Sequence, residues 1–284
     1  MTKEHGNRRL SFFVLCLGLL VATVLFSAPV FLQPAIRWAL SAGLLAVIGI
    51  ATWKAGLAQM GAAPDSGRMA LTAAALLIFP LALAALMPGF GPPQFADHTQ
   101  NVFRYIVLFI DAVFVFCGMT ILHDVLRASG ERLYSRLGLA LILAATPLYL
   151  VWAGLLLEEH RAALAGNSWA GGPWNTWLMS FADVLLFFAG LLTYLATALF
   201  ALSLKRTQWI GAKASIVFVA LNFTAALCLI ARGIDFPDPT LVFAQGYSVP
   251  GWIAGIPAIP WFMPGIFGLI LLRRTARQQL VALS

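Results

Sequence analysis

Long apolar segments recur along this 284-residue chain, and they constrain its fold more than any other feature. A helix needs about 20 apolar residues to cross the hydrocarbon core of a bilayer. The segments of this length are residues 10–32, 36–58, 69–88, 102–125, 136–157, 177–203, 214–232 and 252–272. The chain is 61% hydrophobic and 10% charged, which is more apolar surface than a soluble core of this size can bury. We predict an all-α polytopic bundle of eight transmembrane helices at residues 10–272, with short tails at 1–9 and 273–284.

Basic residues divide the loops between these segments into two sets that alternate along the chain. Fourteen of the 18 lysines and arginines lie in the loops and tails on the same side as the N-terminus. The other side has only Arg37, Arg104, Arg161 and Arg232. Because loops rich in lysine and arginine stay in the cytoplasm, this alternation predicts that both termini are cytoplasmic. The excess of arginine over lysine favours a bacterial inner membrane, and the scattered charge argues against nucleic-acid binding.

The first segment has a second interpretation. Residues 1–29 combine a basic head, an apolar stretch and small residues, which are the parts of a secretory signal peptide. The apolar run is long for that role and no clear A-x-A site follows it, so we favour a retained helix. Cleavage would leave seven transmembrane helices and would not change the side of any later loop.

Two carboxylates lie inside otherwise apolar segments. FIDAVFVFCG at 109–118 and FADVLLFFAG at 181–190 align without gaps, with Asp111 opposite Asp183. Both segments run inward, so each carboxylate lies about 10 Å inside the outer boundary at 1.5 Å per residue. An ionised carboxylate there costs at least about 2–3 kcal/mol unless it is paired, protonated or hydrated. We therefore expect both carboxylates to face protein or water.

The same alignment indicates a weak internal repeat. Pro147 and Asn222 occupy corresponding positions in the helices that follow the two acidic segments, and Pro80 lies at the equivalent place in the third segment. This pattern predicts three helical hairpins (two–three, four–five and six–seven) that enter the membrane in the same sense.

Two arginines are candidate partners for the carboxylates. Arg232 ends the seventh segment and Arg104 begins the fourth, and either guanidinium could reach a buried carboxylate. Asn222 adds a polar group in the interior. One interpretation is a structural clamp between helices four, six and seven. The other is a water-accessible acidic pocket that binds a proton, a cation or a cationic head group. The predicted ligand-binding residues are Asp111, Asp183, Arg232, Arg104 and Asn222.

Little else in the sequence indicates catalysis. His98, Glu158, Glu159 and His160 gather on the outer side, where a His/Glu cluster can bind a divalent ion. Their spacing matches no ligand motif, so we interpret them as solvated residues. The chain has no G-x-S-x-G, H-E-x-x-H or P-loop motif, and its three cysteines have no ligand spacing. We predict no catalytic residue, metal or cofactor.

The last segment contains Pro257, Pro260 and Pro264 in its first half, a spacing that bends or breaks a helix. Such breaks often line binding sites in transporters. The first functional hypothesis is a proton- or cation-linked small-molecule transporter, or a ligand-binding protein, that lies in the lipid bilayer and takes a small cationic or proton-coupled ligand at an outward-facing acidic pocket. The alternatives are a membrane-embedded enzyme of lipid or isoprenoid metabolism and a non-catalytic subunit or assembly factor of a membrane complex.

Overall fold

The computed structural model describes residues 2–27, 33–91, 93, 96–167, 173–234 and 261–282. Every regular element in these ranges is helical. The elements are α1 (Thr2–Ser27), α2 (Pro34–Ala55), η1 (Leu57–Ala62), α3 (Asp65–Leu83), η2 (Ala84–Leu86), α4 (His98–Ala128), α5 (Tyr134–Leu164), α6 (Pro173–Arg206), α7 (Ala212–Arg232) and α10 (Phe262–Ala282). The prediction of an all-α chain is confirmed over these residues.

The number of membrane-spanning helices agrees with the prediction in part. Within the described ranges, the seven helices α1 to α7 have the length and apolar composition needed to cross a membrane. α10 begins at Phe262 and continues past Arg273 and Arg274, so it is shifted toward the C-terminus relative to the predicted segment 252–272. Residues 252–260 of that segment lie outside the described part of the chain. The chain is therefore a helical protein compatible with multiple membrane crossings, and an eighth crossing stays a prediction.

The prolines of the apolar segments lie at different places relative to the helices. Pro80 and Pro147 lie inside α3 and α5, as expected. Pro264 lies in the first turn of α10, where a proline removes no intrahelical hydrogen bond. Pro257 and Pro260 lie outside the described residues. Pro264 therefore gives no evidence for a break within the last helix.

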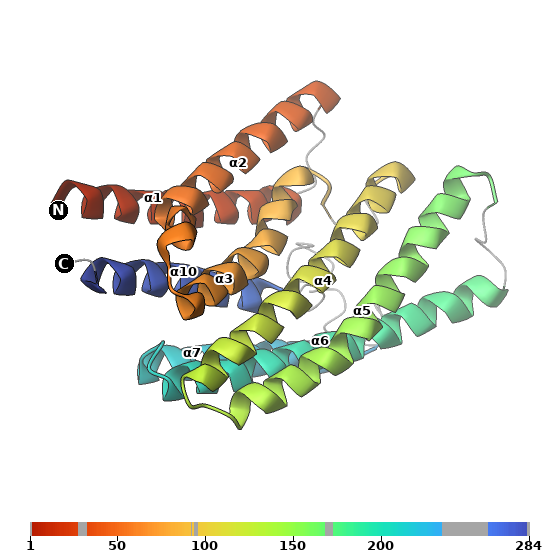
Figure 1. The fold of residues 1–284 in the computed structure, drawn as a ribbon. Helices are drawn as coiled ribbons and strands as arrows, with labels where there is room; N and C mark the ends of the chain where they lie inside the picture. Colours follow the sequence, from red (N-terminus) through yellow and green to blue (C-terminus); the bar gives the residue numbers. More distant parts are fainter. Residues whose placement is uncertain are drawn as a thin grey trace.

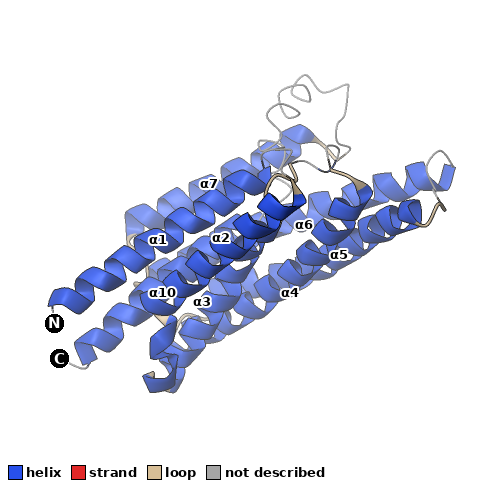
Figure 2. Cartoon of the chain, turned by 90° about the horizontal axis from the view of Figure 1, so that it is seen from above, coloured by secondary structure: helices blue, strands red, loops and turns tan. Residues whose placement is uncertain are grey.

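Neighbouring helices in the chain pack as antiparallel pairs from α3 to α7, and α1 pairs with α2. α10 returns to pack along α3, and the two views show these helices side by side (Figure 1 and Figure 2). Figure 1 shows the N- and C-termini at the same end of the bundle. This agrees with the expectation that both termini lie on one side, while the identity of that side and of the membrane stays a prediction.

Helix packing agrees with two of the three predicted hairpins, while a repeat that relates them stays a prediction. α4 packs against α5, and α6 packs against α7. α2 instead packs mainly against α1, while α3 packs against α4 and α10. The second and third helices therefore do not form a packed hairpin, because η1 and the turn that follows separate them. Weak alignments of leucine- and alanine-rich segments do not distinguish between these pairings.

Close packing between α3 and α10 depends on glycine. A Cβ atom on Gly268 would lie 2.8 Å from the backbone carbonyl oxygen of Ala74, and a Cβ atom on Gly265 would collide with Leu81. Small residues on membrane helices allow two backbones to approach this closely. The two glycines of α10 therefore fix the position of the C-terminal helix on α3.

We expect Gly268→Ala to lower the free energy of unfolding by about 1 kcal/mol, because the backbone atom that its methyl group meets cannot turn aside. The matched control is Gly49→Ala in α2, where a Cβ atom would meet nothing within 4 Å. Alanine should be neutral or slightly stabilising there because it favours the helix. Denaturant titration in detergent micelles measures both. Equal effects at the two positions would contradict close contact of α3 with α10.

Candidate functional site

Asp111 is buried in α4 without a partner. Its side chain is 3% exposed, and its Oδ1 atom has no hydrogen-bond partner. It forms no ion pair with a basic side chain in the described residues. Asp111 lies seven residues before Gly118, whose position contacts Leu76 and Leu77 of α3, so it lies on the face of α4 that packs toward α3. A carboxylate in this environment is stable only when it is neutral or binds a ligand.

Arg104 has other partners than the carboxylates. It is 2% exposed, and its Nη2 atom donates a hydrogen bond to the Gly91 carbonyl oxygen at 2.7 Å. Its guanidinium carbon lies 5.7 Å from the ring centroid of Phe26 and 5.9 Å from that of Phe90. Aromatic faces attract a cation electrostatically. Arg104 therefore fastens α4 to the loop before it and to the end of α1, rather than neutralising Asp111.

Tyr105 joins α4 to α5 at the end of the bundle away from the termini. Its buried ring stacks on His160 of α5, with centroids 5.6 Å apart at 10°, and meets Trp152 edge-on at 5.6 Å. Asp183, the second predicted carboxylate, lies half-buried in α6. No sequence motif marks Tyr105, because its contacts join residues about 50 positions apart in the chain.

His98 and His160 form a pair that their sequence separation did not reveal. Their Nδ1 atoms lie 2.9 Å apart, which requires one ring to donate and the other to accept. Glu159 is close enough to interact with His98 electrostatically, whereas Glu158 pairs with Arg161 at 2.7 Å. Within the described residues, no three His, Cys, Asp or Glu side chains are arranged to hold a metal ion. His98 is exposed and His160 half-buried, so neither is withdrawn from solvent, and their contact adds a pairing to the solvated residues that we expected.

Asn222 contacts α6 far from Asp183. Its Oδ1 atom accepts a hydrogen bond from the Thr197 hydroxyl of α6, and its Nδ2 atom donates to the Phe218 carbonyl oxygen at 2.8 Å. Thr197 is fourteen residues beyond Asp183, or about 21 Å along the helix. Asn222 therefore joins α7 to α6 as a buried polar contact. The side chain of Arg232 lies outside the described part of the structure.

The contacts of Asp111, Arg104 and Asn222 do not bring these three predicted site residues together. Arg104 and Asn222 each satisfy a structural contact elsewhere. No protein-family model matches the chain, and comparisons with curated proteins and with solved structures give no match. Function must therefore be argued from these side chains alone.

Proposed function

We propose that this multi-pass membrane protein binds a proton or a small cation at Asp111 and couples that binding to the movement of a small molecule. The observation that supports the proposal is a carboxylate, 3% exposed, with no ion pair among the described residues. A membrane-embedded ionisable group of this kind normally marks an ion or proton pathway. The cytoplasmic location of both termini and the bacterial inner membrane belong to the same proposal, through the distribution of basic residues.

Polar groups also extend from Asp111 toward the outer end of the bundle. Tyr105 lies six residues before Asp111 on α4, about 9 Å nearer that end. His160 stacks on the Tyr105 ring, and His98 contacts His160 in turn. These groups can bind and relay protons where an apolar wall could not. The chain has no ATP-binding motif, so an ion gradient or another subunit would drive any transport.

Infrared difference spectroscopy tests whether Asp111 exchanges a proton or a cation. In lipid films stepped between acidic and alkaline pH, or between sodium and choline chloride, we expect a protonated-carboxyl C=O band that changes in the wild type. Asp111→Asn should abolish that band because an amide does not titrate. Asp124→Asn is the matched control, since Asp124 lies exposed near the other end of the same helix. A band that persists in Asp111→Asn would contradict the proposal.

Proteoliposomes test the transport step itself. With a pH-sensitive dye trapped inside, a panel of small amines and cations should produce substrate-dependent proton movement in the wild type and in Asp124→Asn. Asp111→Asn should show none of this coupled movement. Unchanged proton movement in Asp111→Asn would remove Asp111 from the transport pathway.

A further inference from the structure

A cavity of about 350 Å³ opens at the end of the bundle where the termini lie. It is formed by the turn between α4 and α5 together with the end of α6. The lining residues are Ser129, Gly130, Glu131, Arg132, Leu133, Arg206 and Thr207. By the distribution of basic residues, this is also the end of the chain with the higher density of positive charge.

The carboxylate that lines this cavity, that of Glu131, is hydrogen-bonded to other groups of the protein. The Glu131 carboxylate accepts hydrogen bonds from the backbone N–H groups of Leu133, Tyr134 and Ser135 at 2.8–2.9 Å. It accepts another from the Ser203 hydroxyl at 2.6 Å. The carboxylate thus faces the start of α5 and α6, and it does not pair with either lining arginine. The charged groups that the cavity offers to a ligand are therefore cationic.

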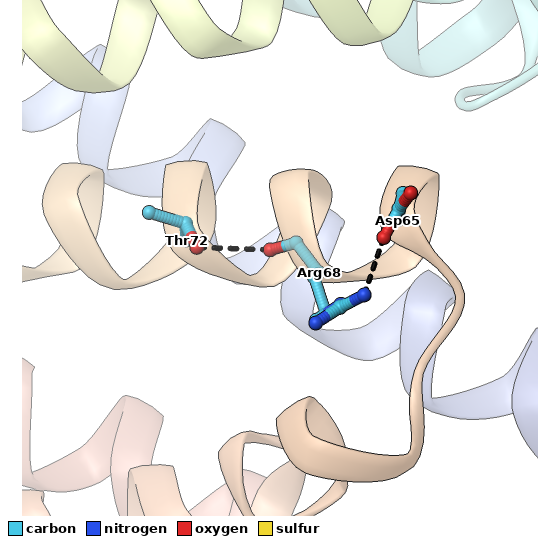
Figure 3. Close-up of polar contacts among 3 residues, drawn as sticks. All are labelled: Asp65, Arg68 and Thr72. Atoms are coloured by element: carbon cyan, nitrogen blue, oxygen red, sulfur yellow. Dashed lines mark hydrogen bonds and ion pairs between the residues drawn. The ribbon is translucent and has the colours of Figure 1, made fainter.

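Arg132 and Arg206 supply that positive charge. Arg206 is held over the Tyr134 ring, with its guanidinium carbon 4.5 Å from the centroid, and its Nη2 atom lies 3.4 Å from the Tyr134 hydroxyl. Neither arginine forms an ion pair within the described residues. Arg68, at the start of α3, differs from both of these arginines because it forms an ion pair with Asp65 (Figure 3). The cavity thus contains two guanidinium groups that form no ion pair among the described residues, beside one hydrogen-bonded carboxylate, and its net charge is positive.

We propose that this cavity binds the phosphate headgroup of an anionic phospholipid. Guanidinium groups bind phosphate through two parallel hydrogen bonds, and basic pockets between membrane helices bind lipid headgroups in this way. A lipid fits better than a soluble phosphate because the cavity continues onto an apolar surface. Leu133, which lines the cavity, is 57% exposed, and Leu137, one turn later on α5, is 47% exposed. An acyl chain can lie along these two side chains while its phosphate contacts the arginines.

Native mass spectrometry of the purified full chain tests this site. The protein is equilibrated in micelles containing equal amounts of phosphatidylglycerol and phosphatidylcholine, and the lipids that remain bound are counted. We expect preferential retention of phosphatidylglycerol, reduced about tenfold by Arg132→Gln and further by Arg132→Gln with Arg206→Gln. Arg68→Gln is the matched control, because it removes an arginine of the same end that is already paired. It should leave retention unchanged.

Two further arms separate the possible outcomes. Arg206→Lys keeps the charge without the planar fork, so it should retain less phosphatidylglycerol than the wild type and more than Arg206→Gln. Thermal unfolding with added phosphatidylglycerol, phosphatidylcholine or inorganic phosphate then identifies the source of the phosphate. Stabilisation by phosphatidylglycerol alone, lost in Arg132→Gln, supports the lipid site. Equal stabilisation by inorganic phosphate, or equal lipid retention in Arg132→Gln and Arg68→Gln, would overturn it.

Discussion

Asp111→Val is expected to raise the free energy of unfolding by about 1–3 kcal/mol, the cost of burying a polar group without a hydrogen-bond partner. The carboxyl group is 3% exposed and its Oδ1 atom has no partner, so valine removes a cost and loses no contact. The same substitution should abolish the proton-dependent infrared band. A gain in stability that accompanies a loss of function is typical of residues retained for a site.

Denaturant titration in micelles measures the change, with two companion variants. Asp111→Asn keeps a polar side chain of the same shape and should alter stability little. Asp183→Asn combined with Asp111→Val should give an additive result, because Asp111 forms no ion pair among the described residues and its Oδ1 atom has no hydrogen-bond partner. A loss of about 3–5 kcal/mol in Asp111→Val would show instead that the carboxylate belongs to a buried pair. Arg232 would then be the partner to examine, as the clamp interpretation requires.

Helix positions were predictable from the sequence because a bilayer imposes one length on every crossing. The ends of the helices were less predictable, since α4, α5 and α6 continue past their apolar segments. α4 begins at His98 because the Asp97 side chain accepts a hydrogen bond from the Gln100 backbone N–H at 2.7 Å. That cap is a local polar interaction. It lies outside the apolar run on which the segment boundary was based.

The burial of Asp111 was also predictable from its apolar segment, whereas its lack of a pairing arginine was not. Arg104 and Asp111 are seven residues apart on α4 and share a face, which suggested a pair. Side chains on a helix tilt toward its N-terminus, and the N-terminus of α4 is on the outer side of Asp111. Arg104 therefore points away from Asp111, toward the Gly91 carbonyl oxygen. The contact between His98 and His160 joins residues 62 positions apart, and spacing within one helix carries no information about it.

Glu131→Gln is expected to lower the free energy of unfolding by about 2–3 kcal/mol at pH 7. Burial alone would raise the pKa of the Glu131 carboxyl group, but hydrogen bonds from the Ser203 hydroxyl, the backbone N–H groups of Ser135 and Tyr134 and the Ser135 hydroxyl lower it from 4.5 to about 2. The charged form is thus favoured in the folded state, and a shift of this size corresponds to about 3 kcal/mol before solvent screening. Glutamine has no charge, and its amide N–H₂ would face backbone donors.

The pH dependence follows from the same shift. Because the folded-state pKa lies below the unfolded value, the stabilisation by Glu131 is complete above about pH 4.5 and is lost as the pH falls toward about 2. The difference between wild type and Glu131→Gln should therefore shrink between these pH values. Glu158→Gln controls for other carboxylates, since Glu158 lies in an exposed pair with Arg161. A constant difference from pH 7 to pH 3 would contradict the assignment.

Ser203→Ala separates the charge of Glu131 from its role as a connector between helices. The Ser203 hydroxyl on α6 donates to Glu131 at 2.6 Å, across 72 residues, while the other donors lie at the start of α5. Ser203→Ala should cost about 1–2 kcal/mol and should add little in a Glu131→Gln background, because both changes break one network. Additive losses would mean that α5 and α6 are joined by independent contacts. In that case the turn bearing Arg132 could shift without disturbing α6, and the two arginines of the cavity would not be held at a fixed separation.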